Sequence, residues 1–348
     1  MLVSEFDFDL PADLVAQEPA PRGTSRLLVL HRRTGEIEHA SVADLPRFLG
    51  AGDLMVVNNT RVFAARLLGH RVPSGGAVEC LLVRRTADRD VWEALMHPGQ
   101  KLKVGGLVRF EGAAGALTGE ILGRQSFGRR TIRLHADSGG DVVALIDLLG
   151  HMPLPPYIKR PDAAMDRERY QTVFASVRGS IAAPTAGLHF TPDLLDALAA
   201  RGVGKAAVTL HVGYGTFKPV RTEEVESHVV DPEHYEIDDE AAAAINRAKD
   251  ERRRVLVVGT TTTRALEDSA SRHAARLLSG EAEATTFIYP GFEFQVADAL
   301  MTNFHLPKSS LLMLVAAFAG REQVLTAYRA AIAQRYRFYS YGDAMLIL

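Results

Sequence analysis

From Gly150 to the C-terminus, short apolar runs alternate with segments of helical periodicity, and this alternation restricts the chain to a small set of α/β folds. Thr191-Pro192-Asp193 predicts a helix start, because a hydroxyl cap, an early proline and an early carboxylate all suit a helix N-terminus. Further strands are predicted over 207–212 and 255–258, and further helices over 239–254, 260–278, 309–318 and 321–336. Helices should therefore cover a sheet or a barrel, and the pattern does not choose between the two.

The block from Arg66 to Gly150 has a different texture, with many glycines between short β-like pieces. These pieces lie at 77–83, 91–96, 107–110 and 131–134. Short strands separated by glycine turns are typical of a small barrel or sandwich. We therefore expect an α/β catalytic domain formed by residues 1–65 and 151–348, and an inserted, small, all-β, barrel-like domain over residues 66–150.

Composition excludes several classes of protein. A single cysteine, Cys80, rules out a disulfide scaffold, and the N-terminus lacks the basic start and apolar core of a signal peptide. The longest apolar run, 311–320, is about half of the ~20 residues that a membrane-spanning helix needs. The net charge is −2, so a nucleic-acid site must be a local patch. We expect a cytoplasmic protein with no membrane association, and we expect a monomer.

Common catalytic signatures are absent. Val255–Gly259 enters a helix, but no second and third glycine follow, so the dinucleotide fingerprint is not met. The sequence has no P-loop and no nucleophile elbow. With one cysteine and no pair of histidines four apart on a helix, we expect no metal site.

Two segments combine a histidine with a tight turn. In Ala183–Phe190, just before the Thr191-capped helix, His189 would lie beside free helix N–H groups that could bind an anion. In Leu210–Phe217, two glycines follow a strand and would let a ligand approach the backbone, while Tyr214 and Phe217 could stack on a base. For each segment the alternative is a structural loop with packed side chains.

A third segment, Gly259-Thr260-Thr261-Thr262-Thr263-Arg264, places four hydroxyls and a guanidinium where a strand turns into a helix. Capping explains one threonine but not four. Helix N–H groups, hydroxyls and an arginine together suit a carboxylate or a phosphate, so we favour a ligand site here.

The fourth group of segments is rich in aromatic residues. Residues 288–292 and 302–307 resemble a pocket wall and include His305. The tail 336–343 interleaves aromatics with arginine, which suits unstacked RNA bases or, alternatively, the packing of an edge strand. Asn58, Asn59 and Arg61 follow a buried strand, and ligands gather at the carboxyl ends of strands in open α/β folds.

Taken together, these segments resemble, nearly end to end, the QueA family of S-adenosylmethionine:tRNA ribosyltransferase-isomerases. The matching stretches, in order, are 53–66, 150–160, 169–173, 182–190, 210–220, 258–267, 287–291, 298–307 and 336–345. The family typically has a serine where Thr262 or Thr263 stands, and a hydroxyl survives that change. The glycine-rich block matches only loosely.

The resemblance implies a reaction of queuosine biosynthesis. The substrate would be a tRNA whose anticodon stem-loop carries 7-aminomethyl-7-deazaguanine at the wobble position, and S-adenosylmethionine would be the ribosyl donor. Transfer and isomerisation of the ribosyl group would give epoxyqueuosine-tRNA, adenine and methionine. The alternatives are an S-adenosylmethionine-dependent RNA methyltransferase and a non-catalytic RNA-binding module.

We assign the candidate residues to three roles. His189 and His211, with His305 as a third, are the candidates for proton transfer, because imidazole titrates near neutral pH. The candidates for binding S-adenosylmethionine are Thr185, Gly187, Gly213, Gly215, Thr260, Thr261, Thr262 and Arg264. The candidates for binding the RNA substrate are Asn58, Asn59, Arg61, Tyr339, Tyr341 and Asp343, with the Asp343 carboxylate meeting the aminomethyl cation.

Overall fold

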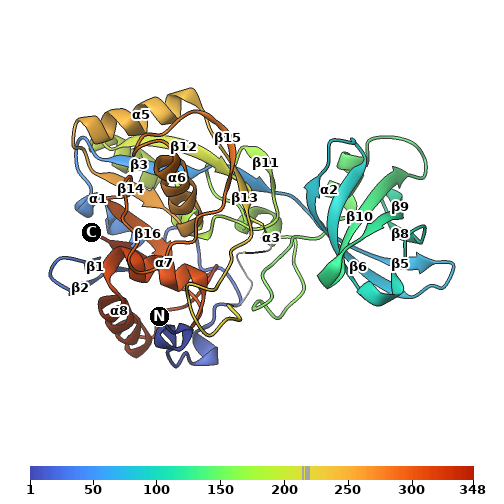
Figure 1. The fold of residues 1–348 in the computed structure, drawn as a ribbon, viewed down its shortest axis with the longest axis horizontal. Helices are drawn as coiled ribbons and strands as arrows, with labels where there is room; N and C mark the ends of the chain where they lie inside the picture. Colours follow the sequence, from blue (N-terminus) through green and yellow to red (C-terminus); the bar gives the residue numbers. More distant parts are fainter. Residues whose placement is uncertain (214, 216–219) are drawn as a thin grey trace.

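The computed structural model describes residues 1–213, 215 and 220–348, and it divides them between a large α/β lobe and a smaller barrel (Figure 1). The large lobe contains β1 (Arg26–His31), β2 (Glu36–Ser41), β3 (Leu54–Asn58), β12 (Gly204–Leu210), β13 (Glu233–Ile237), β14 (Val255–Val258), β15 (Gly280–Ala284), β16 (Ala299–Asn303) and β17 (Ala344–Ile347). They form one open sheet in the order β15-β13-β12-β3-β14-β16-β17-β1-β2. The predicted α/β class with an inserted barrel is confirmed, and the main lobe is a sheet.

The central strands of this sheet are parallel. β12, β3, β14 and β16 are neighbours and run in the same direction, whereas β13, β15 and β2 are added antiparallel towards the edges. All five residues of β3 and all four of β14 are buried. A parallel sheet covered on both faces requires such continuous apolar strands, which is why the period-two alternation of a half-exposed strand is missing from the sequence.

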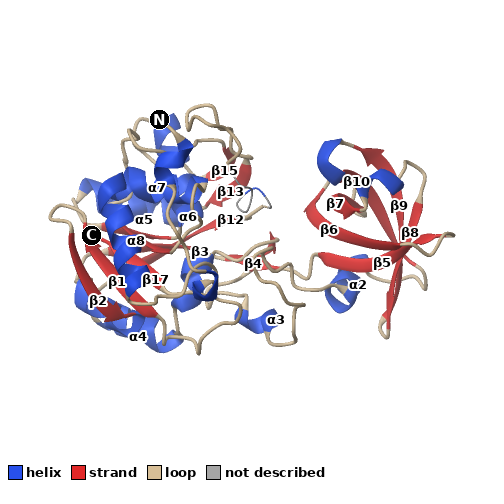
Figure 2. Cartoon of the chain, turned by 90° about the horizontal axis from the view of Figure 1, so that it is seen from below, coloured by secondary structure: helices blue, strands red, loops and turns tan. Residues whose placement is uncertain are grey.

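Helices cover both faces of the sheet (Figure 2). One face carries α1 (Leu45–Phe48) and α4 (Pro192–Ala200), and the other carries α5 (Asp239–Asp250), α6 (Thr260–Arg272), α7 (Ser310–Ala319) and α8 (Arg321–Ala333). Successive strand side chains alternate between the faces: Val56 packs with α5 to α8, and Met55 and Val57 pack with α1 and α4. Each fully buried side chain of this size contributes about 1.5–3 kcal/mol.

No single helix in the described ranges is long and apolar enough to cross a membrane; α7 and α8 meet that test only as a pair bent by 113°.

The smaller lobe is a closed barrel of β5 (Arg66–Val72), β6 (Ala77–Arg85), β7 (Val91–His97), β8 (Leu107–Gly112), β9 (Gly115–Arg124) and β10 (Arg129–Ala136). Helix α2 (Val142–Leu149) packs Val142 and Ile146 into the same core as Trp92 and Phe110. Closure leaves the barrel without an unpaired edge strand.

The chain enters and leaves the barrel at one place. The backbones of Arg66 and His151 pair with each other, and beside them β4 (Thr60–Val62) and β11 (Val177–Ser180) form a short parallel pair in the large lobe. Gly150 lies at this junction, where a Cβ would overlap the carbonyl oxygen of Ala64. A side chain there would therefore push the two connections apart.

The helix predicted over 260–278 ends earlier, at Arg272. Ala274 and Ala275 adopt φ values of 50° and 64°, and the chain then turns into β15. The helical propensity of residues 273–278 is overridden by tertiary contacts. Buried Asp268 of α6 holds the segment that follows β15 against this helix. Its carboxylate accepts hydrogen bonds from the backbone of Thr285 and Thr286 and forms an ion pair with Arg272.

Replacing Asp268 by Asn should lower the free energy of unfolding by about 1–3 kcal/mol, because it weakens the hydrogen bonds that the fully buried carboxylate accepts from Thr285 and Thr286 and removes its ion pair with the 40% exposed Arg272. The matched control is Asp250→Asn, since the Asp250–Arg276 pair is 58% and 51% exposed and should be worth less than about 1 kcal/mol. Urea denaturation measures both variants. Equal losses would contradict this account of how α6 is held.

Candidate active site

The site lies at one edge of the sheet, where four neighbouring parallel strands end. β12 ends at Leu210, β3 at Asn58, β14 at Val258 and β16 at Asn303. The segments that follow these strands contain most of the predicted site residues. Because the carboxyl ends of these strands face the same way, the segments that follow β12, β14 and β16 meet at one cleft, whose lining residues lie between positions 157 and 340 of the sequence.

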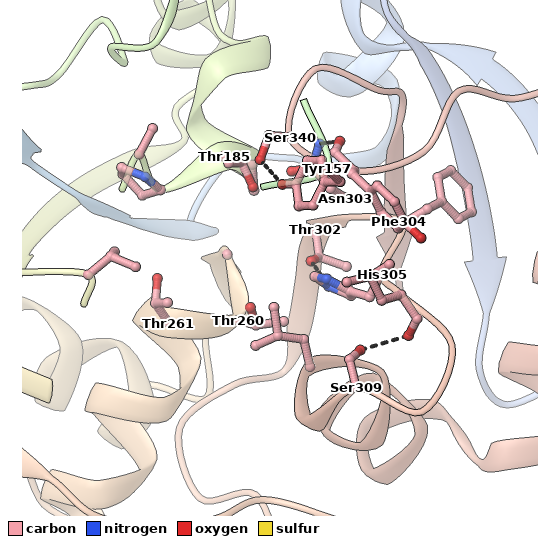
Figure 3. A pocket seen from close by; sticks show the side chains of 18 residues that line it. Tyr157, Thr185, Thr260, Thr261, Thr302, Asn303, Phe304, His305, Ser309 and Ser340 are labelled. Atoms are coloured by element: carbon pink, nitrogen blue, oxygen red, sulfur yellow. Dashed lines mark hydrogen bonds between the residues drawn. The ribbon is translucent and has the colours of Figure 1, made fainter. Parts of the chain in front are cut away.

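A pocket with about 650 Å³ of empty space, part of it open to solvent, lies at this edge. In Figure 3, Thr260 and Thr261 lie on one side of the pocket, and Tyr157, Asn303 and Ser340 lie on the other. The remaining lining residues are Ala183, Pro184, Thr185, Ala186, Val212, Gly259, Thr302, Phe304, His305, Leu306, Ser309, Leu311 and Tyr339. Its size and mostly apolar wall with a few convergent polar groups are typical of a small-molecule site.

A second pocket, with about 590 Å³ of empty space, lies on the other side of the α6 N-terminus. The two pockets share Thr260, Thr261 and Leu311, so that helix end separates them. Gly215, Asp231, Glu233, Arg264 and Phe287 are among the other residues that line the second pocket.

The α6 N-terminus is not capped by a side chain. Its N-cap residue is Gly259, which has φ 95°. Thr262 and Thr263 donate their hydroxyls to the carbonyls of Val258 and Gly259 within the helix. Of the four threonines, Thr260 and Thr261 face the pockets, whereas Thr262, a predicted ligand residue, is fully buried and bonded to the backbone. The uncapped helix end keeps its positive dipole directed at the cleft.

Arg264 is engaged by the protein. It donates to Glu233, to the carbonyls of Asp231 and Ala284, and through Nε to the carbonyl of Thr286. These bonds use four of its five N–H groups, so this guanidinium is better placed to hold the wall of the second pocket than to bind a ligand carboxylate.

His189 lies behind the first pocket and not on its wall. It is 4% exposed, and its Nε2 lies 3.1 Å from Nδ2 of Asn303, which lines the pocket. Burial lowers the pKa of His189 to about 4, so the ring is neutral at pH 7.

His305 lines the first pocket directly. It is 8% exposed, and its Nε2 lies 2.8 Å from the hydroxyl of Thr302, which lines the same wall. Burial lowers the pKa of His305 to about 3. A neutral imidazole therefore faces the cavity, and of the three predicted histidines it is the one whose side chain reaches the pocket wall in the described part of the chain.

His211 is held away from the pockets by a tight packing contact. Its Nδ1 lies 2.8 Å from the hydroxyl of Thr60, and its ring stacks on His234 at 6.2 Å. A Cβ on Gly179 would overlap the His211 ring, so only glycine fits there. Burial, and secondarily the charge of His234, lower the pKa of His211.

Of the three predicted RNA-binding residues at or just after the end of β3, two are hydrogen-bonded within the protein and one lies outside both pockets. Both functions of the Asn58 amide are used by the backbone, since Nδ2 donates to Leu210 and Oδ1 accepts from Thr60 and Leu210. Asn59 accepts from the hydroxyl of Thr209, and Arg61 is exposed on β4, outside both pockets.

Asp343 was expected to pair with the aminomethyl cation of the substrate, but its partner in the structure is an arginine of the protein. It is 3% exposed and forms an ion pair with Arg26, 3.0 Å away, while the backbones of Arg26 and Arg337 also donate to it. Because a guanidinium already neutralises this carboxylate, the structure gives no support to its pairing with a substrate amine.

The C-terminal aromatic residues are divided between the pocket and the core. Tyr339 lines the first pocket, has φ 73°, and packs against Tyr157 with ring centroids 4.7 Å apart. Burial raises the pKa of Tyr157 to about 12, and its hydroxyl pairs with that of Ser340. Tyr341 lies deeper and donates to Asp166, which is fully buried and bonded to Arg160.

Of the predicted cofactor-binding glycines and Thr185, some line a pocket and others do not. Thr185 lines the first pocket and Gly215 the second. Gly187 packs against Thr172, and the backbone N–H of Gly213 donates to Glu233. The two aromatics predicted to stack on a base, Tyr214 and Phe217, lie outside the described residues.

Several lining residues were missed at the level of sequence. Asn303 lies in the stretch 302–307 that was predicted as a pocket wall but was not itself singled out, Tyr157 and Ser340 lie inside stretches that were noted for other reasons, and Glu233 lies outside all of them. The signal available for Asn303 is the same as for Asn58: a polar residue that ends a fully buried strand. The residues that the structure describes contain no group of three His, Cys, Asp or Glu side chains suited to a metal ion.

The fold and the cleft together define an α/β protein whose pocket, at the carboxyl edge of a parallel sheet, has the size and lining typical of small-molecule sites. A family model described as "Queuosine biosynthesis protein" matches residues 3–347. The S-adenosylmethionine:tRNA ribosyltransferase-isomerases of Symbiobacterium thermophilum and Desulfitobacterium hafniense are each 51% identical over 349 residues, covering 100% of both chains. The crystal structure of the S-adenosylmethionine tRNA ribosyltransferase of Thermotoga maritima is 38% identical with a TM-score of 0.55, covering 99% of this chain and 100% of that one.

The chain therefore belongs to the queuosine biosynthesis family that the sequence resembles, the QueA family, and it is a transferase.

The lowered pKa of His305 predicts a pH dependence of stability. Between pH ~6.5 and ~3 the unfolded chain binds a proton at this ring that the folded chain does not, so the free energy of unfolding should fall as the pH falls through this range. His305→Gln should show a shallower fall, measured by chemical denaturation from pH 7 to 4. Parallel curves for the two proteins would show that the ring is not held neutral.

Proposed function

We propose that this chain transfers and isomerises the ribosyl group of S-adenosylmethionine onto 7-aminomethyl-7-deazaguanine in the anticodon stem-loop of tRNA. The products are epoxyqueuosine-tRNA, adenine and methionine. The observation that carries the proposal is the 51% identity, over the whole of both chains, to proteins named S-adenosylmethionine:tRNA ribosyltransferase-isomerase. The two adjoining pockets support it, because one could hold the nucleoside of S-adenosylmethionine and the other its amino-acid tail.

The α6 N-terminus is our proposed site for the methionine carboxylate. It offers uncapped backbone N–H groups and the hydroxyls of Thr260 and Thr261 to both pockets. The nucleoside would then lie in the first pocket against Tyr157 and Tyr339. In this arrangement Arg264 supports the second pocket through Glu233, and the carboxylate is bound by the helix end instead of by the guanidinium.

Proton transfer starts, in our proposal, with removal of a proton from the ribose C5′ beside the positive sulfur, which stabilises the resulting ylide. The C4′–O4′ bond then breaks together with the bond from C1′ to adenine, so that O4′ becomes an aldehyde oxygen on C1′ and adenine leaves with a proton. The aminomethyl nitrogen gives up a proton and bonds to C4′, C5′ bonds to C1′ to close the carbon ring, and the O4′ alkoxide bonds to C5′ as the bond from C5′ to sulfur breaks and methionine leaves. His305 is our candidate among the three histidines for these transfers, because its side chain lines the pocket. His211 would act only through a change in its contact with Thr60.

The proposed binding of tRNA is based on where the first pocket opens on the protein. The tRNA anticodon loop would present its base at the cleft beside Tyr339, and the contacts would include phosphates, so binding should weaken as salt increases. Asn59 and Arg61 remain candidates only for contacts outside the pockets, and Tyr341 is buried against Asp166. We propose that the protein acts as a cytoplasmic monomer without metal.

Product analysis tests the reaction directly. Purified protein with S-adenosylmethionine and tRNA carrying the aminomethyl base should release adenine and methionine in equal amounts, and tRNA lacking the aminomethyl group should give neither. Chromatography of the small products separates the alternatives: S-adenosylhomocysteine would indicate a methyltransferase, and no product would indicate an RNA-binding module.

Thr261→Val should raise the KM for S-adenosylmethionine about tenfold with little change in kcat, because a hydroxyl bond to a carboxylate is worth about 1.5–3 kcal/mol. Thr263→Val is the matched control, since its hydroxyl bonds to Gly259 inside the helix. Steady-state kinetics at saturating tRNA gives both constants. If the two variants behave alike, the carboxylate is not bound by this helix end.

A further inference from the structure

A buried amide in the first pocket has one function without a protein partner. Asn303, the last residue of β16, is 2% exposed and lines the pocket. Its Oδ1 is buried, and no described residue donates a hydrogen bond to it. A buried carbonyl left without a donor costs about 1–3 kcal/mol, so such an atom on a pocket wall points to a ligand that supplies the donor.

The orientation of this amide is fixed by its other contacts. Nδ2 lies 3.1 Å from the carbonyl oxygen of Tyr339, and because a carbonyl can only accept, the amide atom facing it must be the nitrogen (Figure 3). The same nitrogen lies 3.1 Å from Nε2 of His189. Turning the amide over would set two oxygens against each other, so Oδ1 is the atom left for the pocket.

The contact with Asn303 also assigns the tautomer of His189. Since Nδ2 donates to Nε2, that ring nitrogen carries a lone pair and the ring proton lies on Nδ1. The lone pair that a proton acceptor would need is therefore already occupied by Asn303. His189 itself is not on the pocket wall.

We propose that Asn303 accepts, through Oδ1, a hydrogen bond from an N–H group of the bound substrates, and that His189 is a positioning residue that holds this amide in place. The inference rests on the proposed function. Two substrate groups have the required chemistry: the exocyclic amine of the adenine in S-adenosylmethionine, and the aminomethyl group of the tRNA base. Both are N–H donors small enough to reach a wall shared with Tyr157 and Tyr339.

Binding and turnover of three variants test the inference, using the full chain. Asn303→Ala should weaken binding of one substrate about tenfold: a higher dissociation constant for S-adenosylmethionine identifies the adenine amine, and one for modified tRNA identifies the aminomethyl group. His189→Gln, which keeps an acceptor for the amide, should retain near-normal kcat and the pH profile of the wild type. His189→Leu, which removes the acceptor, should lose as much as Asn303→Ala, and the double variant should lose little more.

The outcomes are distinguishable from failure of the proposed function. If the wild type releases no adenine, the reaction is wrong, but the dissociation constants still test Asn303. Unchanged binding of both substrates to folded Asn303→Ala would overturn the inference. A loss of a hundredfold or more in kcat for His189→Gln, with one limb of the pH profile gone, would make His189 a proton-transfer residue and would overturn the positioning role.

An independent observation concerns the barrel. Phe127 is 92% exposed and has φ 56°, in the turn before β10. Arg124 and Arg129 flank it, with Lys101 and Lys103 exposed on the same barrel. A phenyl ring held in solvent by a left-handed backbone, among cations, is unlike the ordinary polar turn of a barrel.

The end of the barrel that carries this turn contacts the large lobe beside the second pocket. Arg129 reaches to within 3.8 Å of Asp231, which lines the second pocket, and Arg84 of the same lobe lies 3.6 Å from Glu283 on β15. These contacts place the end of the barrel that carries the Phe127 turn beside the second pocket, which adjoins the first pocket at the α6 N-terminus. The charge around the Phe127 turn suits a polyanion.

We infer that Phe127 stacks on an unpaired base of the anticodon loop that neighbours the modified base, again on the basis of the proposed function. Single-stranded loops are recognised by such stacking on aromatic side chains, at about 1–3 kcal/mol per base. The role is one of positioning the RNA, with no part in the chemistry.

Phe127→Ala should raise the dissociation constant and KM for modified tRNA by roughly five- to a hundredfold, corresponding to that stacking energy, and should leave the constants for S-adenosylmethionine unchanged. Phe127→Trp should restore binding. Val104→Ala, which trims another exposed apolar side chain of the barrel (61% exposed), is the matched control. Unchanged tRNA binding by Phe127→Ala, or a wild-type dimer that Phe127→Ala dissociates, would overturn the inference.

Discussion

The parallel direction of four neighbouring strands is the constraint on which the rest of the structure depends. Because β12, β3, β14 and β16 run the same way, their carboxyl ends meet at one edge, and the segments that follow β12, β14 and β16 build the cleft. The crossovers that make such a sheet possible place helices on both faces and leave the strand ends open. Each strand end then contributes a different chemistry, from the amide of Asn303 to the uncapped N-terminus of α6.

At this edge the same residue types serve either structure or ligand binding, and the hydrogen bonds decide which. The amide of Asn58 is bonded to the backbone of β12 and joins two strands, whereas the amide of Asn303 has a buried oxygen to which no described residue donates a hydrogen bond. In the threonine run, two hydroxyls close on the helix and two line the cleft. The orientation of the Asn303 amide is fixed in this way, because its nitrogen contacts both Tyr339 and His189.

Much of this could be predicted from the sequence. The alternation after Gly150, the glycine-rich insert and the strand over 255–258 are local patterns, and they were correct because apolar periodicity follows burial. The partners in ion pairs between residues far apart in the sequence could not be predicted in this way. Asp343 forms an ion pair with Arg26, 317 positions away in the sequence, and no local pattern around either residue indicates that pair. For the same reason Arg264 could be recognised as important, but its partner Glu233 could not be identified.

A crystal structure with S-adenosylmethionine bound tests the central claim, that the sulfonium nucleoside occupies the cleft at the carboxyl edge of the parallel strands. The account predicts the methionine carboxylate at the N-terminus of α6 and the adenosine against Tyr157 and Tyr339, so that one molecule spans both pockets. Electron density for the nucleoside on the barrel, or at another edge of the sheet, would contradict it.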